Sequence, residues 1–153
     1  MIEIIPDTRN KQIEFQLKNA KVHMLKYIRT ALFEIGAENT QLIKKYIYRP
    51  PKTGRFYRYY YSPGKFRWHQ ASAPGESPAN RSGKLARSIT YNVHGSLEVE
   101  LVSTLDEKYP KYLEDGTPGG LIKPRPYFLR AVNAKRRDNK RSLIRHVYNN
   151  IRR

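Results

Sequence analysis

Cysteine is absent from this sequence, which excludes a disulfide scaffold and any metal site with cysteine ligands. Long apolar runs are absent too, since none approaches the ~18 residues that a membrane-spanning helix needs. The start, MIEIIPDT, lacks the basic and then apolar pattern of a signal peptide. We therefore expect no membrane partner and synthesis in a cytoplasm.

Acidic residues are scarce, with 13 Asp and Glu against 30 Lys and Arg and a formal net charge of +17. Such an excess favours contact with a polyanion or with an acidic partner surface. It is concentrated in residues 123–153, which hold eleven basic residues and one acidic residue. Hydrophobic residues make up 39% of the 153. We therefore expect one domain with a small core. Part of the chain is expected to become ordered only in contact with neighbouring molecules.

Apolar residues at helical spacing indicate one long helix near the N-terminus. They recur at steps of three and four, at Ile13, Leu17, Ala20, Met24, Ile28, Ala31 and Ile35. Asp7 and Thr8 can cap its start, and the prolines after Arg49 stop it. Gly36 either ends this helix or lies within it. A second helix is predicted from Tyr127 onward.

Two β-hairpins are predicted between the helices. Residues 56–61 and 65–69 are dense in aromatic side chains and flank the turn Ser62-Pro63-Gly64. Residues 89–93 and 97–101 alternate apolar and polar around Gly95-Ser96, which indicates one buried and one wet face. A Pro/Gly-rich loop (71–83) and a single helical turn (85–88) separate the hairpins. A short helix follows within residues 107–115, where Pro110 predicts a late start.

These elements predict an α+β fold: a long N-terminal helix and a C-terminal helix packed on a small antiparallel sheet of two hairpins, with a long Pro/Gly-rich loop. We expect a single domain over residues 1–153. It comprises an N-terminal helical region (1–49), a sheet-and-loop core (50–132) and a basic C-terminal helix (133–153).

Two segments carry motifs whose order and spacing are informative. The first contains PKTGRFY, HQASAPGE and SGKLARSI between residues 51 and 89; the second contains YPKYLEDGT (109–117) and KPRPYFLRA (123–131). Together they resemble the minor neck and tail-component family of long-tailed bacteriophages, the head–tail joining or tail-completion proteins. The likeness covers residues 50–132. Asp115 stands where that family commonly has an aromatic residue, and residues 118–121 alter the usual spacing.

The resemblance implies an α+β fold, no cofactor and no catalysis, and self-assembly into a ring of about six copies. The ring would join head to tail or close the end of the tail tube. Its partners would be adjoining neck, connector or tail-tube proteins, with packaged DNA as a further possibility. The protein would then be a structural component of the virion, assembled in the host cytoplasm, and not an enzyme.

Several motif positions have a physical reason. Gly83 and Gly116 let the chain reverse where a Cβ would clash, and Leu85 and Ile89 anchor the next strand in the core. Pro126 is expected in the first turn of the last helix. The loop 71–83 is expected to reach a partner or the lumen of the ring. The structural motif positions are Pro74, Gly75, Gly83, Leu85, Ile89, Gly116, Arg125 and Pro126.

The first hairpin and the last helix supply the candidate contact residues. Interleaved aromatic and basic residues suit a protein interface, single-stranded nucleic acid, or plain core strands. Residues 135–141 hold five basic residues and no apolar one, so a helix there is solvated or contacts something outside the domain. The candidates are Arg55, Tyr57, Tyr59, Arg67, Trp68, Lys135, Arg136, Arg137, Lys140 and Arg141.

Two other classes of function stay open. A basic nucleic-acid-binding module would account for the net charge. A small ribonuclease-like toxin is less well supported; it would use residues of the first hairpin, namely Tyr59, Lys65, Arg67 and His69. The histidines have no metal-binding spacing. The adjacent acids Glu114 and Asp115 are a candidate catalytic pair, but solvated charges or interface ion pairs are the favoured interpretation.

Overall fold

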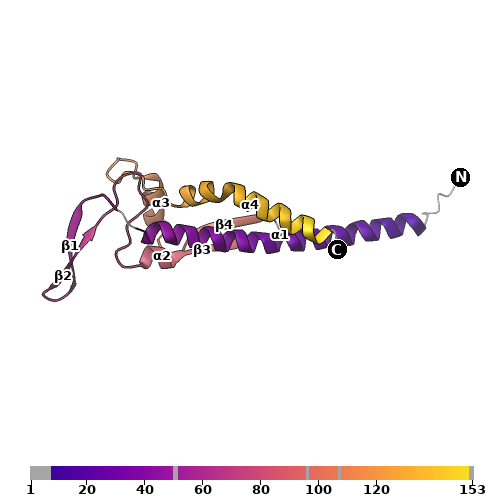
Figure 1. The fold of residues 1–153 in the computed structure, drawn as a ribbon, viewed down its shortest axis with the longest axis horizontal. Helices are drawn as coiled ribbons and strands as arrows, with labels where there is room; N and C mark the ends of the chain where they lie inside the picture. The colour runs from indigo at the N-terminus through magenta and orange to yellow at the C-terminus, as the bar shows by residue number, and fades with distance from the viewer. Residues whose placement is uncertain (1–7, 50–51, 96, 107, 152–153) are drawn as a thin grey trace.

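The structure, a computed structural model, describes residues 8–49, 52–95, 97–106 and 108–151. It confirms the α+β class, because helices flank two separate antiparallel hairpins (Figure 1). The elements in chain order are α1 (Thr8–Tyr48), β1 (Phe56–Ser62), β2 (Lys65–Gln70), α2 (Lys84–Ser88), β3 (Ile89–His94), β4 (Glu98–Ser103), α3 (Lys108–Asp115) and α4 (Phe128–Ile151).

Helix α1 is continuous over 41 residues and passes through Gly36 without a break. It ends at Tyr48, close to the prolines after Arg49 that are predicted to end the helix. The proposed cap at Asp7 lies outside the described residues. Gly36 is buried where α1 meets β3, so its missing side chain serves close packing and does not terminate the helix.

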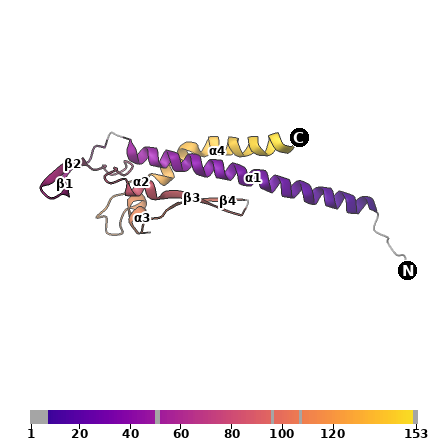
Figure 2. The ribbon, with the colours of Figure 1, turned by 90° about the horizontal axis from the view of Figure 1, so that it is seen from below.

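The N-terminal part of α1 extends well beyond the C-terminal end of α4 (Figures 1 and 2). The predicted apolar stripe is therefore buried only in its second half, at Ala31 and Ile35. Its first members, including Ile13, Leu17 and Met24, are exposed. The apolar stripe of α1 thus continues beyond the part of the helix that packs on the core. Such a stripe indicates that these apolar side chains are buried by contact with another molecule.

Strands β3 and β4 pair with Tyr91 opposite Leu101 and Val93 opposite Val99. These residues share one face with Ile89, and α1 packs against this hairpin (Figure 2). The predicted alternation is confirmed for these positions. Leu97 is the exception: it lies before β4 begins and is exposed, because the turn removes it from the alternating face.

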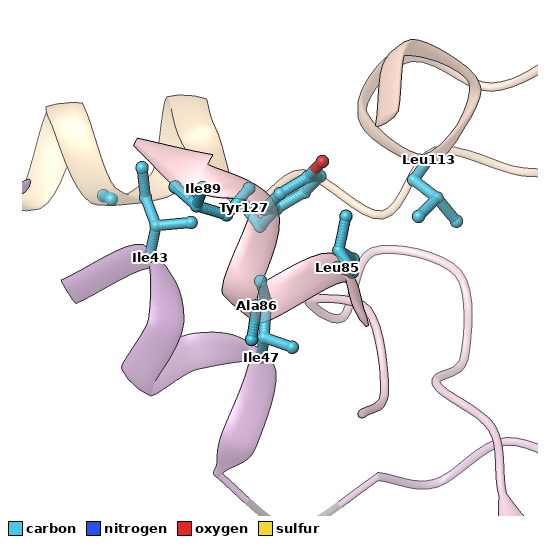
Figure 3. Packing of buried hydrophobic residues seen from close by; sticks show 8 residues of the cluster. Ile43, Ile47, Leu85, Ala86, Ile89, Leu113 and Tyr127 are labelled. Atoms are coloured by element: carbon cyan, nitrogen blue, oxygen red, sulfur yellow. The ribbon is translucent and has the colours of Figure 1, made fainter. Parts of the chain in front are cut away.

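The core lies where α1, α2, α3 and the start of α4 converge (Figure 3). Leu85 and Ile89, the predicted anchors, are both buried in it. Tyr127 is fully buried at its centre, and burial raises the pKa of its hydroxyl. The remaining members of the cluster are Ile43, Ile47, Ala86, Leu113 and Ala131.

Two proline predictions are wrong. Helix α3 begins at Lys108, so Pro110 lies inside its first turn, where the missing N–H removes no helical hydrogen bond. Helix α4 begins at Phe128, so Pro126 precedes the helix and does not lie in its first turn.

The carboxylate of Glu114, at the end of α3, caps α4. It accepts hydrogen bonds from the backbone N–H groups of Tyr127, Phe128 and Leu129 at 2.8, 3.1 and 2.9 Å. A helix N-terminus has unpaired N–H groups and a partial positive charge. The Glu114 carboxylate accepts hydrogen bonds from these groups, and its negative charge interacts favourably with the positive end of the helix. Glu114 thus has a structural role as a helix cap, so its carboxylate is not the solvated charge predicted from the sequence.

Gly83 and Gly116 have φ values of 75° and 83°, a left-handed conformation that side chains disfavour. We expect Gly83→Val to lower the free energy of unfolding by more than ~1 kcal/mol, and the melting temperature by several degrees. Gly119 is the matched control, since nothing lies within 4 Å of a Cβ placed there and its φ is ordinary. Equal melting temperatures of Gly83→Val and Gly119→Val would contradict the prediction.

Candidate assembly interface

Strands β1 and β2 form a two-stranded arm at the end of the molecule opposite the N-terminus (Figures 1 and 2). The Pro63-Gly64 turn, with Gly64 at a φ of 69°, reverses the chain. The base of the arm is tied by backbone hydrogen bonds from Gly54 N–H to Ala71 O and from Ala71 N–H to Arg55 O, both 3.0 Å. Residues along both strands are mostly exposed. An isolated two-stranded hairpin is marginally stable in water, so this arm gains from a partner.

One face of the arm, which we call the Trp68 face, is aromatic with a single cation at its centre. Register places Arg58 opposite Trp68 and Tyr60 opposite Phe66. The Arg58 guanidinium lies 4.8 Å from the Phe66 ring centroid and 5.4 Å from that of Tyr60, and donates a 2.8 Å hydrogen bond to the Tyr60 hydroxyl. Phe66 meets Trp68 edge to face at 6.4 Å. The side chains are thus ordered against one another before any partner arrives.

Exposure of the Trp68 face is high for such large apolar groups. Phe56 is 58% exposed, Tyr60 63%, Phe66 46% and Trp68 63%. Contiguous exposed aromatic surface of this kind is typical of an interaction site. Aromatic side chains and Arg are also the residues that dominate binding energy in protein interfaces.

The opposite face of the arm, the Tyr59 face, is partly covered by the protein itself. Tyr59 meets His69 edge to face at 6.4 Å, and the Arg81 guanidinium lies 5.6 Å from the Tyr59 ring. Arg67 stacks over Tyr61 at 4.6 Å on the same side. This face is therefore braced by the loop that follows the arm.

The arm residues predicted from the sequence are divided between these faces. Tyr57, Tyr59 and Arg67 lie on the Tyr59 face, and only Trp68 lies on the Trp68 face. Arg55 precedes β1 and is exposed. Sequence reasoning missed Phe56, Arg58, Tyr60 and Phe66, although strand alternation combined with the two-residue turn would have grouped them.

The loop 71–83 is held against the body of the protein by hydrogen bonds, and the prediction that it reaches a partner or the lumen of the ring stays a prediction. Glu76 accepts hydrogen bonds from the Thr53 hydroxyl (2.6 Å), the Thr53 N–H (3.1 Å) and the Ala73 N–H (2.8 Å). These bonds, the Thr53 hydroxyl first, hold the pKa of Glu76 at about 2 against an ordinary 4.5. The carboxylate therefore stabilises the loop above pH 4.5 and loses this role as the pH falls through about 2. Ser72 and Ser77 are buried within the loop.

The two motif segments lie against each other. Gly75 N–H donates to Pro124 O at 2.8 Å, and Arg125 Nε donates to Ser72 O at 3.1 Å. From α4, Arg130 donates to Gly75 O at 2.6 Å. Pro74 is exposed beside these contacts. The motif residues of both segments thus form one connected unit, which explains why they would occur together.

The basic stretch 135–141 is divided by the packing of α4 on α1. Lys135 pairs with Glu38 at 2.9 Å, which raises the Lys135 pKa, and Asn139 accepts a 3.2 Å hydrogen bond from Asn39. The expectation that this stretch makes no contact within the protomer is therefore wrong at these two positions. The exposed basic members are Arg136, Arg137, Lys140 and Arg141, and the acidic Asp138 is exposed among them.

The residues of the ribonuclease alternative come together only in part. His69 and Tyr59 are in contact, and burial, followed by the Arg81 charge, lowers the His69 pKa. His69 and Arg81 also line a hollow of about 570 Å³ with Lys84, Asp106 and Tyr109. Lys65 is at the far end of β2, beside the turn.

Neither a metal-binding cluster nor a membrane-spanning helix occurs among the described residues. No group of three or more His, Asp or Glu side chains in that part of the chain is placed to hold a metal ion. None of the helices described is both long enough and apolar enough to cross a membrane.

Comparison of the chain with protein-family profiles, curated proteins and solved structures found no match.

Proposed function

We propose that the protein is a structural component of a long-tailed bacteriophage virion, which assembles into a ring at the neck or tail end. The shape of the protomer carries the proposal. Its accessible surface is 11935 Å², whereas a compact monomer of 18.0 kDa would expose about 8,000 Å². A ring needs two interfaces on each copy, and a standard interface covers about 800 Å² on each partner. The excess surface is ample for both.

The location of the exposed apolar groups supports assembly rather than a flexible monomer. Two groups of them lie at the two ends of the elongated protomer, one on the Trp68 face of the arm and one on the projecting part of α1, and others such as Leu121, Leu129 and Ile144 lie between these ends. Both elements are regular secondary structure whose apolar side chains are not covered by the core. Residues 50–132 resemble the neck and tail-component family, and in this chain the two segments that carry the resemblance are in contact. This supports the proposal that the protein belongs to a virion.

The test is the mass of the full chain in solution at moderate salt without nucleic acid. We expect wild type to form a closed oligomer. Replacing Phe56, Tyr60, Phe66 and Trp68 with Ser should raise the monomer fraction at least ~tenfold, because buried aromatic anchors dominate interface energy. Circular dichroism should be unchanged, because these side chains are already exposed. The matched control replaces Tyr57 and Tyr61, each 52% exposed on the Tyr59 face.

A basic nucleic-acid-binding module is the second candidate, because the Trp68 face could stack bases beside a cation. Under that alternative the wild-type chain stays monomeric, and the Trp68-face variant loses affinity for single-stranded DNA. Antibody labelling of tailed particles at the head–tail junction or the tail end would separate the virion role from this alternative.

A further inference from the structure

Resting on the proposed ring, we infer that the Trp68 face of one copy docks into a groove on a second copy, between β4, α3 and the first turns of α4. The groove has a volume of about 760 Å³. Most of its lining is apolar, and Ser103, Lys111, Glu114 and Asp115 are the polar lining residues. The apolar lining consists of Val99, Leu101, Val102, Pro110, Phe128, Leu129 and Val132.

The groove is open to a partner. Leu129 is 60% exposed and Val132 37%, although both belong to the apolar lining. Beside them runs β4, one of only two strands in its sheet, so one of its edges has no strand next to it in the described structure. An apolar groove next to an open strand edge suits a β-hairpin, whose side chains fill the groove while its backbone can pair with the edge.

Charge identifies a second copy as the occupant. Residues 98–115, which build β4 and α3, hold six acidic residues and two lysines in a chain whose net charge is +17. Residues 55–70, the arm, hold four basic residues and no acidic one. The region with a net negative charge thus includes the groove, whose lining has two acidic residues, Glu114 and Asp115, and one basic residue, Lys111. Arm and groove are complementary in sign as well as in apolar character.

The arm of the same copy is not placed to fill this groove. It points away from the body at the end of the molecule, while α3 and the start of α4 lie within the body (Figures 1 and 2). The contact therefore joins two different surfaces on different copies. Such a head-to-tail contact repeats with a fixed rotation and closes into a ring when that rotation divides a full turn.

Cross-linking tests this contact directly, because the chain has no native cysteine. Tyr60→Cys, on the arm, is mixed with Leu129→Cys, in the groove, and a short bis-maleimide is added. Each copy then carries one thiol, so any bond is between copies, and a mass tag on one variant separates mixed from like pairs. The control replaces Tyr60→Cys with Tyr57→Cys, whose side chain lies on the Tyr59 face and is similarly exposed.

We expect the yield of cross-linked mixed dimers with Tyr60→Cys to be at least ~tenfold higher than with the Tyr57→Cys control. Docking raises the effective thiol concentration to the millimolar range. The excess should fall as salt increases, because opposite charges steer the contact. Equal yields from both arm positions in a protein that still forms oligomers would overturn the arm–groove contact and leave ring assembly standing. A wild-type chain that is monomeric under all these conditions would overturn both.

Discussion

Replacing Glu114 with Ala is expected to lower the free energy of unfolding by about 2–3 kcal/mol, which is a large share of the stability of a small domain. One carboxylate accepts hydrogen bonds from three N–H groups at the start of α4, those of Tyr127, Phe128 and Leu129, at 2.8 to 3.1 Å. The substitution leaves these donors without their acceptor and removes a negative charge from the positive end of the helix. Tyr127, at the centre of the core, is one of the three residues held.

Thermal and urea denaturation of Glu114→Ala, Glu114→Gln and Asp115→Ala measures this effect. The Gln variant retains one acceptor oxygen without the charge, so its loss should fall between wild type and Glu114→Ala. Asp115 is exposed and adjacent, and its replacement should change the stability by less than ~0.5 kcal/mol. Similar losses from Glu114→Ala and Asp115→Ala would show that the cap does not hold α4 in place.

Gly36→Ala is expected to destabilise the protein by about 1–3 kcal/mol, although Gly to Ala in a helix normally stabilises by up to ~1 kcal/mol. A Cβ at this position would lie 2.3 Å from Cδ2 and 2.7 Å from Cγ of the Tyr91 ring. Atom Cγ moves away only if Tyr91 changes its χ1 rotamer and leaves its contact with Phe33, or if β3 shifts. The added methyl group must therefore either displace the Tyr91 ring or separate α1 from the sheet.

A double-mutant cycle with Tyr91→Ala distinguishes this clash from a change in helix propensity. Tyr91→Ala alone should be destabilising, because the ring also packs edge to face on Phe33 at 6.4 Å. In the Tyr91→Ala background, Gly36→Ala should become neutral or stabilising, which gives a coupling energy above ~1 kcal/mol. A Gly36→Ala protein with a raised melting temperature would show that the two elements do not meet as closely as described.

The type and order of the elements were determined by the sequence itself. Each depends on neighbours in the chain: the three-and-four spacing of α1, the Pro63-Gly64 turn of the arm, and the alternation of β3. Such signals act through local hydrogen bonding and backbone preference, so they can be recognised in the sequence without knowledge of the tertiary contacts. The same is true of Gly83 and Gly116, whose positive φ follows from turns that only glycine makes easily.

The tertiary structure alone decided what depends on contacts between distant residues. Nothing local to Glu114 marks it as the cap of a helix that begins at Phe128, and nothing near Gly36 predicts the ring of Tyr91. Likewise Glu38 removes Lys135 from the free basic surface. The site was divided in the same way. Composition singled out the aromatic and basic arm, whereas strand register chose which of its side chains share a face, because pairing across the hairpin sets neighbours that the chain order does not.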